Sequence, residues 1–249
     1  MSIFQLQQFA INQSRSGMKI CSDSLLFGAL IPIGGAKRIL DIGAGTGILS
    51  LMQAQKSNNA GCSTLKITAV ELTQAAAEEA QENIDNSPWS NQLELVQQDI
   101  QSFAEQQSAS QQARYDLILC NPPFFAEQSK TATNKPLRHA ARHTDTLSFE
   151  DLINSIDVLL TAAGKVFILL PIAAFASFCQ LAGNKNLYLS RQIQIAESSE
   201  HSAKVTVLEF SRENKDQPIT TQRLNKFQQP NIHSDAVQKL LQSFLLRYS

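Results

Sequence analysis

Cysteine and histidine are scarce in this sequence, and neither is arranged as a metal site. The four cysteines form no CxxC pair and no ladder with histidine, so their spacing indicates neither a zinc site nor a disulfide framework. These cysteines are Cys21, Cys62, Cys120 and Cys179. His139 and His143 are four residues apart, but a metal site would need a third ligand beside them. We therefore expect no metal and a reducing compartment.

Long apolar runs and an excess of one charge are also missing. The longest apolar stretch, Val166–Ala176, contains Pro171 and falls short of the about 18 residues typical of a membrane span. The N-terminus has neither the basic region nor the continuous apolar region of a signal peptide. The 21 Lys and Arg residues nearly balance the 22 Asp and Glu residues, which excludes a uniformly basic nucleic-acid coat but allows a local basic patch. We expect a soluble, cytoplasmic protein that makes no membrane contact.

What the sequence does contain is a regular alternation of strand and helix patterns. Its 249 residues, 43% of them apolar, suit one α/β domain with a self-supporting core. Short apolar runs alternate with longer amphipathic stretches from Arg38 to Phe210, which predicts a mostly parallel sheet. The predicted strands are Arg38–Ile42, Lys66–Leu72, Leu93–Gln97, Tyr115–Cys120, Gly164–Leu170, Leu187–Ile195 and Ala203–Phe210. Only a short polar link joins the last two, so we expect them to form an antiparallel hairpin.

Three segments have helical periodicity, and one polar segment has none. The predicted helices are Thr73–Ile84, Phe149–Leu160 and Asp235–Tyr248. The low-complexity stretch Glu105–Ala113 predicts a surface loop. No linker is long enough to divide the chain, so we expect residues 1–249 to form a single domain. The sequence does not determine the oligomeric state, and we favour a monomer.

A glycine-rich turn follows the first predicted strand. The segment ILDIGAGTGI joins a buried strand to a helix and carries Gly43, Gly45 and Gly47 at alternate positions, where the backbone can take positive φ and approach a ligand closely. The dehydrogenase fingerprint is G-x-G-x-x-G, whereas this sequence has G-x-G-x-G just after Asp41. A carboxylate at this strand end suits a cofactor with an ammonium and a sulfonium better than one with a pyrophosphate.

Two further acids follow the next two strands. Glu71 ends the strand of ITAVEL, where its carboxylate could accept both ribose hydroxyls of a nucleoside. Asp99 follows the strand of LELVQQD, where it could accept from an adenine amino group. Each carboxylate could instead cap the helix that follows it. The occurrence of Asp41, Glu71 and Asp99 together with the glycine turn favours one nucleoside site over three separate caps.

The fourth strand ends in the rigid turn Asn121-Pro122-Pro123-Phe124. Two successive prolines fix φ and donate no N–H, so the turn is rich in acceptors. An exocyclic amine on an aromatic base or an amide is a poor nucleophile because its lone pair is delocalised. Accepting its two N–H groups at the Asn121 side-chain oxygen and the Pro122 carbonyl favours a tetrahedral nitrogen. Phe124 offers a face on which a planar base can stack.

Together, DIGAGTG, Glu71, Asp99 and NPPF resemble the class I S-adenosylmethionine-dependent methyltransferases that modify amino groups. The segments MKICSDSLLFGA, SPW and RHAARHT are most similar to the bacterial family that N6-methylates adenine 37 of valine tRNA, and the resemblance covers essentially the whole chain. It implies a Rossmann-like, seven-stranded class I methyltransferase sheet in residues 38–211. It also implies a lid over cofactor and substrate in residues 1–37 and a C-terminal extension in residues 212–249.

The resemblance also implies a role for individual residues. Those implied to hold S-adenosylmethionine are Asp41, Gly43, Gly45, Glu71 and Asp99, with Lys19 and Asp23 closing over it. Those implied to hold the target base are Asn121, Pro122 and Phe124. The family often has tyrosine at the last motif position, so Phe124 keeps the stacking face and excludes any role that needs a phenol.

Basic residues gather just after NPPF and could bind RNA phosphates, which makes tRNA the expected partner. They are Lys130, Lys135, Arg138 and Arg142. The tail adds Lys215, Arg223, Lys226, Lys239 and Arg247 among acidic residues, and we expect these five to form a solvated surface rather than an RNA contact.

Some alternative functions would methylate a different amine, and others would involve no methyl transfer. An N-P-P-aromatic turn would also suit guanine N2 of ribosomal RNA or a protein glutamine amide. A catalytically silent RNA-binding protein is a different class of function, and the presence of both the cofactor acids and NPPF argues against it. The glycine spacing disfavours a dehydrogenase.

Overall fold

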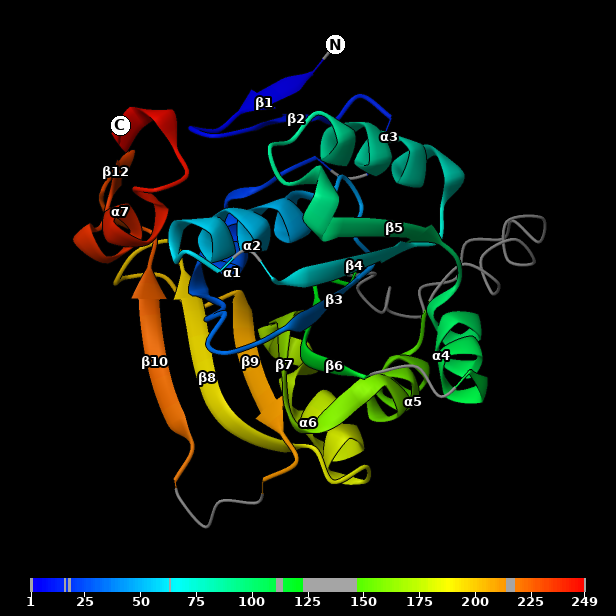
Figure 1. Cartoon of the computed structure of the whole chain (residues 1–249). Helices are drawn as coiled ribbons and strands as arrows, with labels where there is room; N and C mark the ends of the chain where they lie inside the picture. Colours follow the sequence, from blue (N-terminus) through cyan, green and yellow to red (C-terminus); the bar gives the residue numbers. More distant parts are fainter. Residues whose placement is uncertain are drawn as a thin grey trace, which may run out of the picture.

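The computed structural model describes residues 2–15, 17, 19–62, 64–110, 114–122, 147–213 and 218–248. An eight-stranded sheet runs through the molecule in the order β10-β8-β9-β7-β6-β3-β4-β5 (Figure 1). β9 is antiparallel to β7 and β8, and all other neighbours are parallel. The strands are β3 Arg38–Ile42, β4 Lys66–Glu71, β5 Leu93–Gln97, β6 Tyr115–Cys120, β7 Leu160–Pro171, β8 Tyr188–Ala196, β9 Val205–Ser211 and β10 Thr220–Asn225.

The prediction of an α/β fold with a mostly parallel sheet and an antiparallel β8–β9 pair is confirmed. Two boundaries differ from the sequence patterns. Helix α5, Phe149–Leu159, ends earlier than the pattern indicates, and β7 begins at once with Leu160. The hairpin is also not the edge of the sheet, because β10 from the C-terminal extension pairs in parallel with β8.

Helices cover both faces of the sheet, and each face has its own apolar core (Figure 1). On one face, α1 Ser22–Leu30, α2 Ile48–Asn59 and α7 Asp235–Leu241 contribute to the core. On the other face lie α4 Ile100–Ala109, α5 and α6 Phe175–Gly183. α3, Gln74–Asp85, packs against β4, β5 and the short strand β2, Ala10–Asn12. Burial of these apolar stripes against the sheet supplies the main stabilisation of the fold.

The N-caps of α4 and α5 show how local sequence determines where each helix begins. Asp99 caps α4, because its Oδ1 accepts from the backbone N–H groups of Gln101 and Ser102 at 2.9 and 3.0 Å. Ser148 caps α5 by accepting from the N–H of Asp151 at 3.1 Å. The expected loop over Glu105–Ala113 is wrong in its first part, because α4 continues to Ala109. Once a helix is nucleated by its cap, glutamine and alanine extend it readily.

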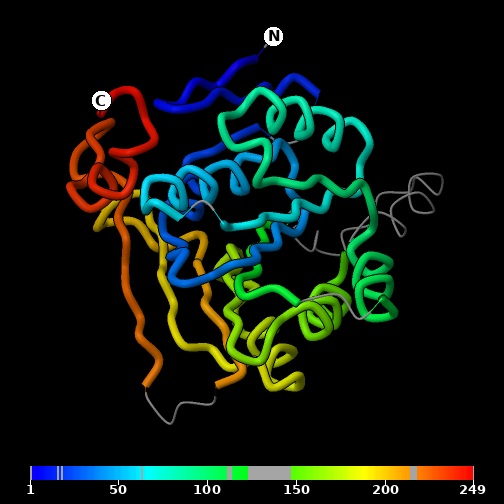
Figure 2. The backbone as a smooth tube through the Cα atoms, in the orientation of Figure 1, coloured from blue at the N-terminus to red at the C-terminus, as the bar shows by residue number. Residues whose placement is uncertain are grey.

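The two ends of the chain form a common layer beside α1 and α2 (Figure 2). Strands β1, Ile3–Gln5, and β2, Ala10–Asn12, make a small antiparallel pair. The backbone N–H of Gln7, in the turn between them, donates to the Phe244 carbonyl at 2.8 Å, and its side chain donates to the Leu245 carbonyl at 2.9 Å. The N-terminal segment and the C-terminal segment therefore support each other.

The C-terminal helix is shorter than its apolar stripe indicates. α7 ends at Leu241, and the chain continues to a short 3-10 helix at Leu246–Tyr248. Phe244 and Leu245 remain buried through this change of direction. Two further short 3-10 helices lie at Ser90–Gln92 and Ile172–Ala174, and a second small strand pair joins β11, Phe227–Gln229, to β12, Ile232–His233.

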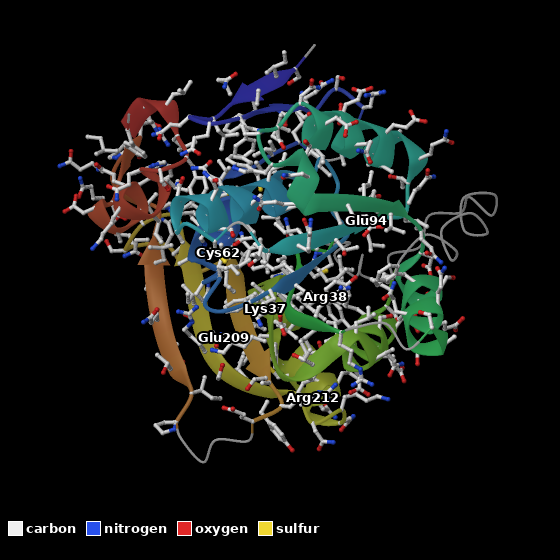
Figure 3. The ribbon with its side chains drawn as sticks, in the orientation of Figure 1. Lys37, Arg38, Cys62, Glu94, Glu209 and Arg212 are labelled. Atoms are coloured by element: carbon white, nitrogen blue, oxygen red, sulfur yellow. The ribbon has the colours of Figure 1, made fainter. Side chains whose placement is uncertain are left out.

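Several charged side chains of the sheet are hydrogen-bonded or paired away from the glycine turn. Lys37 and Arg38, labelled in Figure 3, lie at the start of β3, and their backbone N–H groups donate to the Asp116 carboxylate. Glu209 of β9 pairs with Lys165 at 2.7 Å and with Arg191 at 3.1 Å. No helix among the described residues is long and apolar enough to cross a membrane.

Candidate functional site

The register of the central strands brings the sequence-predicted residues to one edge of the sheet. Ile42 at the end of β3 is the register partner of both Val70 and Cys120. Gly43, Glu71 and Asn121 therefore follow at the same level on three adjacent strands. Glu71 pairs with Gln97, so Asp99 lies two residues beyond that level on β5. Ligands of open α/β sheets bind at this carboxyl edge, and the predicted grouping is realised in the fold.

The glycine turn is held in place by β4. The N–H groups of Gly43 and Ala44 donate to the Val70 carbonyl at 2.9 and 3.1 Å. The N–H of Gly45 donates to Glu71 Oε2 at 2.9 Å. The turn and the neighbouring strand end therefore move as one unit.

Gly43 and Gly45 make an open cradle. Their φ angles are 71° and 58°, in the left-handed region that favours glycine. A Cβ built on either residue would meet no heavy atom within 4 Å. Fold packing therefore does not require glycine for space at these two positions, whereas a ligand approaching the backbone would.

Asp41 is a fully buried carboxyl beside this cradle. Its Oδ2 accepts from the N–H of Ser50 at 3.1 Å and from the Ser50 hydroxyl at 2.7 Å. Its Oδ1 is buried and has no hydrogen-bond partner among the described residues. Burial raises the pKa of Asp41 to about 7, opposed by the two Ser50 bonds and reinforced by the nearby Glu71 charge. A cationic ligand group at Oδ1 would satisfy this oxygen and its charge.

Glu71 links the glycine turn to the start of α3. Its Oε1 accepts from the N–H and the hydroxyl of Thr73 at 2.9 and 2.8 Å, while Oε2 accepts from Gly45. Thr73 is the residue before α3 and makes no side-chain cap there, because its hydroxyl is directed to Glu71. Oε2 has one unused lone pair that could accept a ribose hydroxyl, and Oε1 could accept the second hydroxyl in place of that of Thr73.

Asp99 caps the helix that follows it and leaves its second oxygen for the other role that the sequence left open. It caps α4 through Oδ1, and no described residue donates to Oδ2 within hydrogen-bond distance. The side chain is half-buried at the carboxyl edge of β5. Capping thus fixes the orientation of a carboxylate whose second oxygen could accept from an amino group.

Asn121 lies at the end of β6, half-buried beside the first turn of α1. Its Nδ2 donates to the Ser24 hydroxyl at 3.1 Å, and Pro122 after it is buried. Cys120 before it is also buried, and burial raises the pKa of its thiol so that it stays protonated. Phe124 and the basic residues Lys130, Lys135, Arg138 and Arg142 lie outside the described residues.

The segment expected to close over the cofactor leads into α1. Lys19 is exposed, and Asp23 in the first turn of α1 pairs with Lys226 at 2.6 Å. Lys226 is only 8% exposed and also donates to Glu197 at 2.9 Å. The expectation that Lys226 belongs to a solvated surface is therefore wrong, because it is buried as a cation between two carboxylates.

The segment expected to form a lid is also linked to the glycine turn through α3. Asn83 of α3 donates to the Thr46 carbonyl and the Asn12 carbonyl, both at 2.9 Å, and accepts from the N–H of Asn12 at 2.8 Å. Glu79, one turn earlier, accepts from the N–H groups of Ser14 and Arg15 at 2.6 and 2.8 Å. α3 therefore positions the lid next to the strand ends.

Several site residues are absent from the sequence predictions, among them Ser24, Ser50 and Asn83. Ser24 and Asn83 act through contacts between distant segments, while Ser50 binds Asp41, nine positions earlier. Only Ser24 had a sequence signal, because it follows Asp23 in MKICSDSLLFGA. Among the described residues, no three His, Cys, Asp or Glu side chains are grouped as a metal would require.

The fold and the site define a class I S-adenosylmethionine-dependent methyltransferase. The unpartnered Asp41 Oδ1 and the open glycine cradle fit a cofactor with an ammonium and a close-lying backbone contact. The methyltransferase small domain model matches residues 16–168. The fold resembles the crystal structure of a predicted O-methyltransferase from Agrobacterium tumefaciens, with a TM-score of 0.65 and 18% identity, covering 88% of this chain and 94% of the other.

Two curated relatives identify a particular family within this class of methyltransferases. A tRNA1(Val) (adenine(37)-N6)-methyltransferase of Shewanella loihica is 35% identical, covering 98% of this chain and 99% of the relative. The protein of the same name from Cronobacter sakazakii is 38% identical, covering 84% and 81%. The chain belongs to the family of tRNA1(Val) (adenine(37)-N6)-methyltransferases, within the methyltransferase small domain family.

Proposed function

We propose that this protein transfers the methyl group of S-adenosylmethionine to the exocyclic N6 of adenine 37 in tRNA1(Val). The main support for the proposal is the position of Asn121. Asn121 follows Cys120, which is the register partner of Ile42, and so it lies level with Gly43 at the start of the glycine turn. This places an amide acceptor beside the cofactor cradle. The names of the relatives supply the base and the tRNA.

The cofactor is assigned to the carboxyl edge of β3, β4 and β5. Gly43 and Gly45 would let it approach the backbone, and Asp41 Oδ1 would accept from its ammonium. Glu71 would accept the ribose hydroxyls, and Asp99 Oδ2 the adenine amino group. Lys19 would close over the cofactor, while Asp23 fixes this segment through its ion pair with Lys226.

The chain's own contribution to the reaction is alignment. Bound S-adenosylmethionine supplies an activated methyl group, so neither a strong base nor a metal is needed in this proposal. Asn121 Oδ1 and the Pro122 carbonyl would each accept one N–H of the adenine amine. Both bonds strengthen as the nitrogen becomes tetrahedral and positively charged, which favours the transition state over the ground state. Phe124 would stack against the base and exclude water.

The target adenine must leave its stack to reach this edge of the sheet. Extruding a base costs a few kcal/mol, and least where it is already single-stranded, so an anticodon loop is a better target than a duplex. Lys130, Lys135, Arg138 and Arg142 follow the catalytic turn and would bind the flanking phosphates. Since tRNA acts in the cytoplasm, the proposed reaction belongs there.

The test is methyl transfer to unmodified tRNA1(Val), with labelled cofactor and mass spectrometry of the nucleosides. We expect N6-methyladenosine with adenine at position 37 and no product with guanine there. Ribosomal RNA and a protein fraction offered in parallel test the guanine N2 and glutamine alternatives. Preferential labelling of either, or no transfer to any acceptor, would reject the proposed substrate.

The RNA contact has its own test. Arg138→Ala combined with Arg142→Ala should weaken tRNA binding and flatten its salt dependence, because two phosphate contacts are removed. Cofactor affinity should not change. Binding is measured by filter retention over a series of salt concentrations, and Lys239→Ala, at an exposed position of α7, serves as the control for loss of a surface charge.

A further inference from the structure

The hydrogen bond between Asn121 and Ser24 joins the catalytic turn to the lid. Asn121 Nδ2 donates to Ser24 Oγ at 3.1 Å, although the two residues are 97 positions apart. Ser24 is 8% exposed, and its hydroxyl lies 3.3 Å from Cys21 Sγ. The bond therefore occupies the donor end of the amide in a largely buried position.

Which end of the amide is occupied decides what Asn121 can do. A carboxamide has an acceptor oxygen on one side and a donor NH₂ group on the other. Only the oxygen can accept an N–H of an adenine amine. If the amide turned over, its N–H groups would face those of the amine, and two donors would oppose each other. A serine hydroxyl could serve either end of the amide, but Ser24 can direct its own proton to Cys21 Sγ at 3.3 Å. With its proton used there, Ser24 can only accept from Asn121, which places Nδ2 toward Ser24 and Oδ1 on the remaining side of the group.

Such a bond orients the amide only if its anchor is immobile, and α1 is fixed at both ends. At the start of the helix, Asp23 next to Ser24 pairs with Lys226, which is also bound to Glu197. At its end, Lys56 of α2 donates to the carbonyls of Gly28, Ala29 and Ile31. A cation at a helix C-terminus also interacts favourably with the helix dipole. α1 also packs against α2 and α7.

We propose that Ser24 is a positioning residue, which fixes the Asn121 amide with Oδ1 toward the target amine. This inference rests on the proposed function, because Asn121 must contact the substrate amine for its orientation to matter. Ser24 itself touches neither cofactor nor base in this assignment. The role couples the lid to the catalytic turn, since movement of α1 would release the amide.

The experiment compares single-turnover methyl transfer and cofactor binding in Ser24 variants. Ser24→Ala should lower the transfer rate about five- to tenfold, the effect of one net hydrogen bond. Cofactor affinity, measured by calorimetry, should stay within about twofold. Ser24→Thr keeps the hydroxyl and should recover most of the rate. Ser155→Ala is the control, because Ser155 is a buried helical serine whose hydroxyl donates to the Asp151 carbonyl on the opposite face of the sheet.

Testing Ser24→Ala in a second variant distinguishes orientation of the Asn121 amide from a general effect of Ser24 on the fold. In Asn121→Asp the carboxylate offers an acceptor oxygen on both sides, so its rotation no longer matters. Adding Ser24→Ala to this variant should change the residual rate less than about twofold. The same five- to tenfold loss in both backgrounds would overturn the positioning role, as would an unaffected rate in Ser24→Ala alone. Absence of transfer by the parent protein would instead reject the proposed function, and the inference with it.

Discussion

Replacing Asp41 by asparagine should stabilise the cofactor-free protein at neutral pH, and this gain should disappear in acid. The carboxyl is fully buried, and its pKa is raised from 3.8 to about 7. In the unfolded chain Asp41 ionises near its ordinary pKa, so between these two values the folded protein holds more protons. Its contribution to stability therefore falls as the pH rises through this interval.

The size of the effect follows from the difference between the two pKa values. Each pKa unit corresponds to about 1.4 kcal/mol, so full ionisation of Asp41 costs at most ~4 kcal/mol of unfolding free energy. Most of this cost is already present near neutral pH, and little of it remains near pH 4. The two bonds from Ser50 reduce the cost, while the Glu71 charge increases it.

The measurement is urea unfolding of the parent and Asp41→Asn without cofactor, at several values between about pH 4.5 and about pH 7.5. Asparagine keeps the size of the side chain and one acceptor for Ser50, and the cost of its buried NH₂ group does not depend on pH. The difference in unfolding free energy between Asp41→Asn and the parent should therefore grow as the pH rises. A constant difference across this range would refute the assignment of the raised pKa to Asp41.

Three further outcomes test the site. Glu71→Ala should weaken cofactor binding about tenfold to a hundredfold, because a carboxylate that accepts two hydroxyls is lost; unchanged affinity in a calorimetric titration would contradict its role. Asn121→Ala should lower single-turnover methyl transfer about 10²–10³-fold while cofactor affinity stays within a few-fold. Near-normal transfer would refute the role of its amide. Lys226→Met should lower unfolding free energy by about 1–3 kcal/mol, because Asp23 and Glu197 lose their shared cation. Lys239→Met, at an exposed position, should leave urea unfolding unchanged, and equal effects of both variants would contradict the ion-pair explanation.

The sequence alone predicts the part of the fold that depends on buried, periodic segments. β3, β5 and β6 have the bounds that their apolar runs predict. β10 was missed because an edge strand is solvated on its outer side, and its residues TTQRLN carry no alternation of apolar and polar side chains. The expectation of a loop was wrong over Glu105–Ala109, because composition alone does not reveal the Asp99 cap that starts α4.

The residues of the candidate site likewise fall into those that the sequence predicts and those that only the structure reveals. Asp41, Glu71, Asp99 and Asn121 could be found from the sequence, because parallel strands carry their last residues to a common edge. The Ser24 contact with Asn121 could not, since it depends on how α1 packs over the sheet. Nor could burial of Lys226, because a lysine in a polar tail looks the same in sequence whether solvated or paired.

The support of the lid by the C-terminal extension bears on the order in which the protein is completed during synthesis. A nascent chain emerges from its N-terminus, so the glycine turn and β3 to β6 are available long before residues 226–248. Lys226, Phe244 and Leu245, which contact Asp23 and Gln7, leave the ribosome after the residues that they hold. The N-terminal segment is thus secured only after residue 245 has emerged, and shorter nascent chains contain the glycine turn without these contacts.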